Sequence, residues 1–184
     1  GNDKFAPLHK AAEQGSVECC ELLLQHGADP AAKNHAGQIP LHFAVFSASV
    51  SCCELLLQYG SDPNTQVSSC PRSRFVCGIG QIHCDEQQDN NDRAPLHEAV
   101  AASFVECCEI LISYGADAVI QDAHGRYPLH LAKRNDDSTQ ELLIGHHFDW
   151  DANIFRRLCE QGKATALRRM LEQKSTIMTY DLHI

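Results

Sequence analysis

The chain has 184 residues, of which 43% are hydrophobic and 21% are charged, a composition typical of a folded soluble protein. No stretch approaches the roughly 18 consecutive apolar residues of a membrane helix, so we expect no membrane insertion. The net charge of −9 opposes contact with phosphate backbones, so we expect no nucleic-acid ligand and a bias toward partners with basic surfaces.

The first predicted unit begins at Pro7, because a proline at a helix start loses only an N–H that would be unpaired there anyway. A short helix with small residues on one face follows and ends at Gly15. Apolar residues at three- and four-residue spacing over 17–24 predict a second helix. Gly27 suits its end, because the left-handed conformation common there favours glycine. A turn-rich stretch over 29–37 leads to the next proline.

The same unit then recurs along the chain. The tripeptide Pro-Leu-His occurs at residues 7–9, 40–42, 95–97 and 128–130, at intervals of 33, 55 and 33 residues. Cys-Cys-Glu follows in the same phase three times, and so does a Gly-x-Asp tripeptide. The middle interval equals one period plus an insertion of 22 residues. Two short helices cannot bury their own apolar faces, so neighbouring units must stack.

The 33-residue period, the Pro-Leu-His helix start and the Gly-Ala-Asp helix end together resemble ankyrin repeats, over about residues 3–149. The resemblance implies an all-α ankyrin-repeat solenoid of stacked helix–turn–helix units with β-turn fingers. The chain departs from the family pattern at the residue before each Pro-Leu-His, usually Thr, which is here Ala6, Ile39, Ala94 and Tyr127. The fourth unit also has one residue fewer between its helices and lacks Gly-Ala-Asp near Gly145.

These observations divide the chain into five parts. We expect repeats one and two over 1–66, an insertion over 67–91, repeats three and four over 92–150, a degenerate capping repeat over 151–174, and a tail over 175–184. Terminal repeats are commonly atypical because one of their faces meets water.

Six of the ten cysteines form adjacent pairs inside the predicted second helices. Neighbours on a helix point about 100° apart, so such a pair cannot close on itself without distortion. We predict free cysteines that act as small buried hydrophobes, and therefore a reducing location, cytoplasm or nucleus.

The motif histidines His9, His42, His97 and His130 occupy one position in four successive repeats, about 10 Å apart, which is too wide for a shared zinc ion. The family resemblance implies that each bonds the backbone between repeats. The insertion holds four residues of metal-ligand type, Cys70, Cys77, His83 and Cys84. Their spacing lacks a Cys-x-x-Cys knuckle, so we expect no metal and no cofactor, with these four as the candidates.

We find no catalytic signature, so we expect a protein that is not an enzyme. The resemblance implies partner binding by finger residues and by the exposed ends of the first helices. Carried over repeat by repeat, these positions are Glu13, Gln14, His35, Gln38, Phe46, Arg93, Ala102, His124, Arg126, Tyr127, Arg134 and Asn135. Phe46 and Tyr127 are the favoured anchors, because aromatic side chains dominate interface energetics.

The predicted function is that of a monomeric protein–protein interaction module: an adaptor, scaffold or inhibitor that binds a protein or peptide on its concave surface. One alternative is the substrate-recognition part of a ubiquitin ligase whose ligase-recruiting box is removed. Another is a metal- or redox-sensing protein that uses the insertion.

Overall fold

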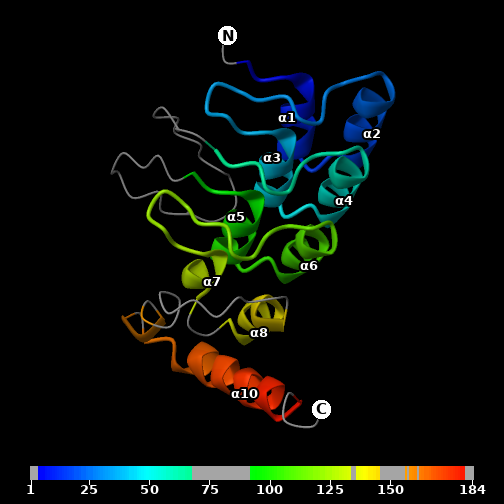
Figure 1. Cartoon of the computed structure of the whole chain (residues 1–184). Coiled ribbons are helices and arrows are strands. Elements are labelled where there is room, and N and C mark those ends of the chain that lie inside the picture. Colours follow the sequence, from blue (N-terminus) through cyan, green and yellow to red (C-terminus); the bar gives the residue numbers. More distant parts are fainter. Residues whose placement is uncertain are drawn as a thin grey trace.

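The computed structural model describes residues 4–67, 92–133, 136–145, 156, 158–160 and 162–180 (Figure 1). All regular secondary structure in these ranges is helical, which confirms the predicted all-α fold. The helices are α1 Pro7–Glu13, α2 Val17–Gln25, α3 Pro40–Phe46, α4 Val50–Gln58, α5 Pro95–Ala102, α6 Val105–Ser113, α7 Pro128–Leu131, α8 Asp137–Gly145 and α10 Ala164–Tyr180.

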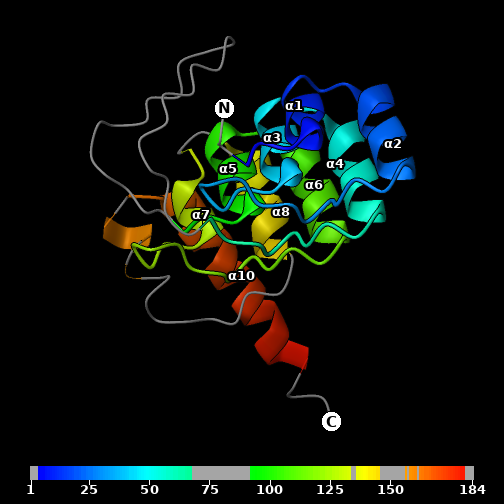
Figure 2. The same ribbon diagram turned by 90° about the horizontal axis from the view of Figure 1, so that it is seen from above.

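The first eight helices form two parallel columns. The inner helices α1, α3, α5 and α7 each contact the next inner helix, and the outer helices α2, α4, α6 and α8 do the same. Seen from above, the two columns lie side by side, and α10 extends away from them (Figure 2). We call the connections from an outer helix to the next inner helix fingers: the first spans 26–39, the second 59–94 and the third 114–127.

Leucines of the Pro-Leu-His motifs form the centre of the stack. Leu8, Leu41, Leu96 and Leu129 are all fully buried. Each lies at the second position of its inner helix and belongs to the same buried cluster. The repeat period thus places one large apolar side chain per unit in a single continuous core.

Five of the six paired cysteines are buried between the outer helices, as predicted for small hydrophobes. Cys19 on α2 is the exception and is exposed. All cysteines within the described residues are free.

The insertion leaves the finger geometry at its base intact. In the first and third fingers a backbone hydrogen bond closes the hairpin, from Asn34 N to Gln38 O at 3.0 Å and from Asp122 N to Arg126 O at 2.9 Å. The second finger has the same bond, from Val67 N to Arg93 O at 3.2 Å, although 25 residues separate its two partners. Repeats two and three therefore stack as the others do.

Deleting residues 68–89 should consequently leave the fold unchanged. The deletion restores the 33-residue period. Shortening a loop of this size lowers the entropic cost of closing it by about 1–2 kcal/mol. We expect the melting temperature, followed by circular dichroism, to stay level or rise. A fall of several degrees would instead show that the inserted residues contribute to the stack.

The C-terminal part packs against the fourth repeat. Helix α10 contacts α8 and buries Ala166 and Met170, while Leu158 is also fully buried. The Lys163 ammonium is buried and donates to the carbonyl oxygens of Leu129 and His130, at 2.9 and 2.8 Å. Helix α10 runs through Tyr180 and thus crosses the boundary at residue 174 that we expected between cap and tail.

Candidate partner-binding surface

Three of the four motif histidines link their inner helix to the finger that follows it, while His130 Nδ1 accepts a hydrogen bond from Tyr127 N at 2.9 Å. The Nδ1 atoms of His9, His42 and His97 accept hydrogen bonds from the backbone N–H three residues earlier, at 3.0–3.3 Å. Nε2 therefore carries the proton and donates it to a carbonyl oxygen of the following finger. The acceptors are Gln38, Arg93 and Arg126, at 3.1, 3.4 and 3.1 Å respectively. No hydroxyl is needed before the proline, because the backbone N–H fills that role.

These bonds require neutral imidazoles. Burial lowers the pKa of His42 and of His97 to about 4, and it lowers the pKa of His9 as well. The backbone hydrogen bonds oppose this shift without reversing it. At pH values well above 4 these histidines are neutral and hold the finger carbonyls in place.

The three fixed carbonyls belong to one position, two residues before the proline of each following inner helix. The side chains of Gln38, Arg93 and Arg126 therefore form a regular column, one per repeat, on fingers whose backbone is fixed. All three are partly exposed. Such a column is a preorganised surface, because little backbone freedom remains to be lost on binding.

The first half of the surface is aromatic. Phe43 packs edge-on against Phe5 and Phe46, with ring centroids 5.1 and 6.3 Å apart, and it also contacts His9. Phe43 itself is buried, whereas Phe46 at the end of α3 is half-exposed. Phe46 thus stands on a rigid aromatic base, as the prediction of an anchor requires.

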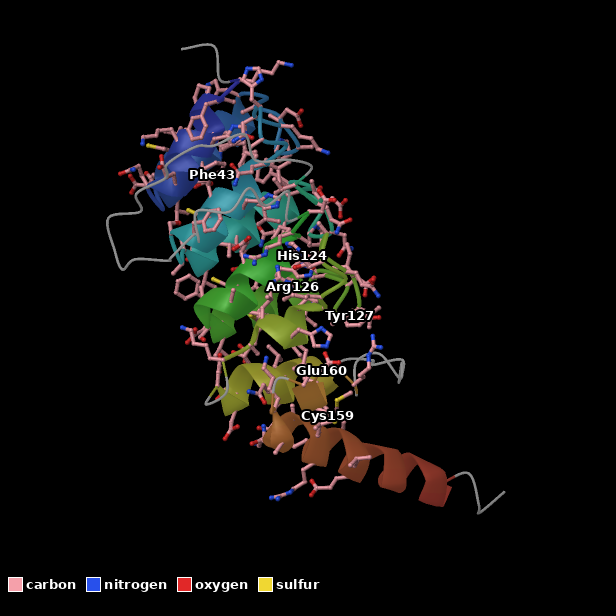
Figure 3. The ribbon with its side chains drawn as sticks, turned by 90° about the vertical axis from the view of Figure 1, so that its left-hand side faces the viewer. Phe43, His124, Arg126, Tyr127, Cys159 and Glu160 are labelled. Carbon is pink, nitrogen blue, oxygen red and sulfur yellow. The ribbon has the colours of Figure 1, made fainter. Side chains whose placement is uncertain are left out.

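The second half carries two ion pairs. Arg93 Nη1 lies 3.4 Å from Glu98 Oε1 of α5, and Arg126 Nε lies 2.8 Å from Asp122 Oδ2 within the third finger. Burial disfavours the charged form of Asp122, but hydrogen bonds from the Arg126 backbone and side chain outweigh it and hold the pKa of Asp122 below its ordinary value. Figure 3 shows Phe43 on α3 and His124, Arg126 and Tyr127 on the third finger farther along the stack.

The prediction that Tyr127 is an exposed anchor is wrong. Its side chain is buried, its ring lies 5.3 Å from that of His130, and its hydroxyl accepts a hydrogen bond from Gln121 Nε2 at 2.7 Å. Sequence alone contained a signal for this: the residues before the other Pro-Leu-His motifs are apolar, and Ile39 and Ala94 are buried too.

The other candidate positions fall into three groups. Gln14, His35 and His124 are exposed, and Glu13, Gln38, Phe46, Arg93, Ala102 and Arg126 are partly exposed. Arg134 and Asn135 lie outside the described residues, as do the metal candidates Cys70, Cys77, His83 and Cys84. Glu98 and Asp122 were not among the predicted residues. Their role is to pair with Arg93 and Arg126, and only the fold brings these side chains together.

Neither a metal-binding cluster nor a membrane-spanning helix is found among the described residues. Among those residues, no three His, Cys, Asp or Glu side chains are grouped so as to hold a metal ion. None of the helices there is both long and apolar enough to cross a bilayer.

Comparison with known proteins agrees with the repeat architecture. A family model described as ankyrin repeats (3 copies) matches residues 1–67 and 75–154. Ankyrin repeat and SOCS box protein 11 of Danio rerio is 29% identical over 138 residues, which cover 75% of this chain and 39% of that protein.

Two other relatives match over shorter stretches. Rabankyrin-5 of Mus musculus is 33% identical over 90 residues, 45% of this chain and 8% of that protein. Human protein phosphatase 1 regulatory subunit 27 is 49% identical over 39 residues, 21% of this chain and 25% of that protein. The matches span well under half the length of each relative. With most of its length matched by the family model, this chain belongs to the ankyrin-repeat family.

Proposed function

We propose that the chain binds a partner protein or peptide on the surface formed by its fingers and the exposed ends of its inner helices. The observation that carries this proposal is the column of Gln38, Arg93 and Arg126, whose backbone carbonyls are fixed by buried histidines. A row of rigidly held, chemically different side chains suits recognition of another chain.

The distribution of charge separates this surface from the outer one. The four outer helices α2, α4, α6 and α8 carry seven Asp and Glu and no Lys or Arg. Arg93 and Arg126, in contrast, lie on the fingers. The expected bias toward basic partners, which rests on the net charge of the whole chain, therefore applies mainly to the outer helices.

The proposal includes the absence of catalytic activity. Protein phosphatase 1 regulatory subunit 27 is named as a regulatory subunit, which supports a binding role. Arg93 and Arg126 of this surface are engaged in ion pairs.

Affinity capture from cell lysate with two matched variants tests the proposal. The finger-surface variant combines Gln38→Ala, Phe46→Ala and His124→Ala. The outer variant combines Glu21→Gln, Glu54→Gln and Glu109→Gln. We expect mass spectrometry to find a protein that the native chain and the outer variant retain and that the finger-surface variant loses, provided that both variants melt like the native chain. Loss from the outer variant alone would overturn the assignment of the surface.

A second candidate is a substrate-recognition role in a ubiquitin ligase. It is favoured by the similarity to Ankyrin repeat and SOCS box protein 11, which extends over 75% of this chain. Under this reading, expression of the whole protein should shorten the half-life of the captured partner, and a finger-surface variant should not. An unchanged half-life would leave only the binding role.

A further inference from the structure

The finger surface has an aromatic half around Phe46 and a guanidinium half around Arg93 and Arg126. The second half carries two positive side chains on a chain whose net charge is −9. Phe46 lies on the second inner helix, whereas Arg93 and Arg126 precede the third and fourth inner helices. Helices that stack have axes about 8–10 Å apart. Phe46 therefore lies one to two repeats from the two arginines.

In the third finger the positive group lies outside and the negative group lies beneath. The Asp122 side chain is fully buried, whereas that of Arg126 is 27% exposed. Asp122 is also fully engaged: Oδ1 accepts from the backbone N–H groups of His124 and Arg126, and Oδ2 accepts from Arg126 Nε. A partner would meet the guanidinium and not the carboxylate.

The pair of Arg93 with Glu98 of α5 is more evenly exposed, with 21% of the Arg93 side chain and 18% of the Glu98 side chain accessible. Burial raises the pKa of Glu98, and the nearby Arg93 guanidinium opposes that shift only in part. Arg126 and Asp122 also act electrostatically on Glu98, so the four groups form one cluster. Because the Asp122 carboxylate is covered, the cluster presents the Arg126 guanidinium to solvent without its acidic partner.

Both guanidinium groups have donors to spare. A guanidinium offers five N–H donors. Among the described residues, Arg93 Nε and Arg126 Nη2 are buried and have no hydrogen-bond acceptor. An unsatisfied buried donor is unfavourable, and after small side-chain movements a second carboxylate could accept from these two N–H groups.

We propose that the partner presents an extended segment in which an acidic side chain docks against Arg93 and Arg126 and an apolar side chain packs on Phe46. One to two repeats correspond to about 8–20 Å, and an extended chain rises about 3.3 Å per residue, so the two side chains are separated by roughly two to six residues. This proposal rests on the proposed function and adds the chemistry of the partner. It is opposite in sign to what the net charge of −9 suggests.

The first finger supplies a matched variant for the test. At the positions of Asp122 and Arg126 it has Asn34 and Gln38, joined by a bond from Asn34 Nδ2 to Gln38 Oε1 at 3.1 Å. Asn34 Oδ1 accepts from the N–H groups of Ala36 and Gln38, as Asp122 Oδ1 does in the third finger. The double variant Asp122→Asn/Arg126→Gln thus replaces an ion pair with a pair that this fold already holds, without changing the net charge.

The experiment is selection from a displayed library of random 12-residue peptides on the native chain, followed by affinity measurement of the selected sequences. We expect enrichment of Asp or Glu with an apolar residue roughly two to six positions away. Affinity should fall about tenfold or more in Asp122→Asn/Arg126→Gln, fall similarly in Phe46→Ala, and weaken with salt. The outer variant Glu21→Gln/Glu54→Gln/Glu109→Gln should bind within about twofold of the native chain.

The possible outcomes separate this inference from the proposed function. Selected peptides that lack acidic residues, or that bind Asp122→Asn/Arg126→Gln normally yet lose affinity in Phe46→Ala, would overturn the acidic-partner inference and leave the binding surface in place. Peptides that lose affinity only in the outer variant would overturn both. The melting temperature of each variant serves as the folding control.

Discussion

Lowering the pH from 7 to 5 should reduce the free energy of unfolding by about 4 kcal/mol. His42 and His97 have a pKa of about 4 in the folded chain against an ordinary value of 6.5. Between these values the unfolded chain binds protons that the folded chain does not. Stability is therefore complete above about pH 6.5 and is lost as the pH falls toward 4. Each of the two histidines accounts for about 2 kcal/mol of the stability lost at pH 5.

Urea unfolding at the two pH values measures this difference. The pKa of Glu98 is raised in the folded state, so its carboxyl acts in the opposite direction and stabilises the fold as the pH falls. The measurement is therefore best made with Glu98→Gln, which removes that opposing contribution. Equal stability at pH 7 and pH 5, together with protonated His42 and His97 in nitrogen-15 NMR spectra at pH 5, would contradict the role assigned to these histidines.

Replacing Leu96 by alanine should destabilise the chain by about 2–5 kcal/mol. The Leu96 side chain is fully buried where the second, third and fourth repeats meet, so its truncation leaves a cavity in the continuous core. Because each repeat depends on its neighbours, the loss should reach several of them and broaden the unfolding transition. Chemical denaturation followed by circular dichroism measures the effect.

Leu22→Ala is the matched control. It removes the same atoms from a leucine that is 58% exposed on α2, so we expect a change within about 0.5 kcal/mol. If the two substitutions had equal effects, the assignment of Leu96 to the core would be wrong.

Sequence reasoning located the helices well because each marker of the repeat has a local cause. A proline begins each inner helix, at Pro7, Pro40, Pro95 and Pro128. The glycines that end the first three outer helices, Gly27, Gly60 and Gly115, all have positive φ. These preferences act within a few residues and can be read without knowledge of the fold.

Where a residue departs from the repeat pattern, its local conformation was harder to predict. Gly15 ends α1 with a φ of +64°, as expected, but Ala48 and Ser103 take the same left-handed conformation in the next two repeats, with φ of 52° and 64°. Stacking imposes the turn there although the residues do not favour it. Helix α7 also stops after Leu131 and is shorter than the other inner helices.

The surface was harder to predict than the core for a related reason. Whether Tyr127 is buried depends on His130 and Gln121, and the charge presented by Arg126 depends on how deeply Asp122 lies. The period identifies which positions face the fingers. It does not determine which of their side chains cover one another, because that depends on contacts between neighbouring repeats.

Photo-crosslinking in cells tests the central claim, that a partner protein binds the finger surface, most directly. Two proteins would carry p-benzoylphenylalanine at Phe46 or at His124, and a third would carry it at Glu54 on the outer helix α4. Our account predicts that positions 46 and 124 crosslink to the same protein and that position 54 does not. Crosslinking to a defined protein from position 54 alone would contradict it and place the binding surface on the acidic outer helices.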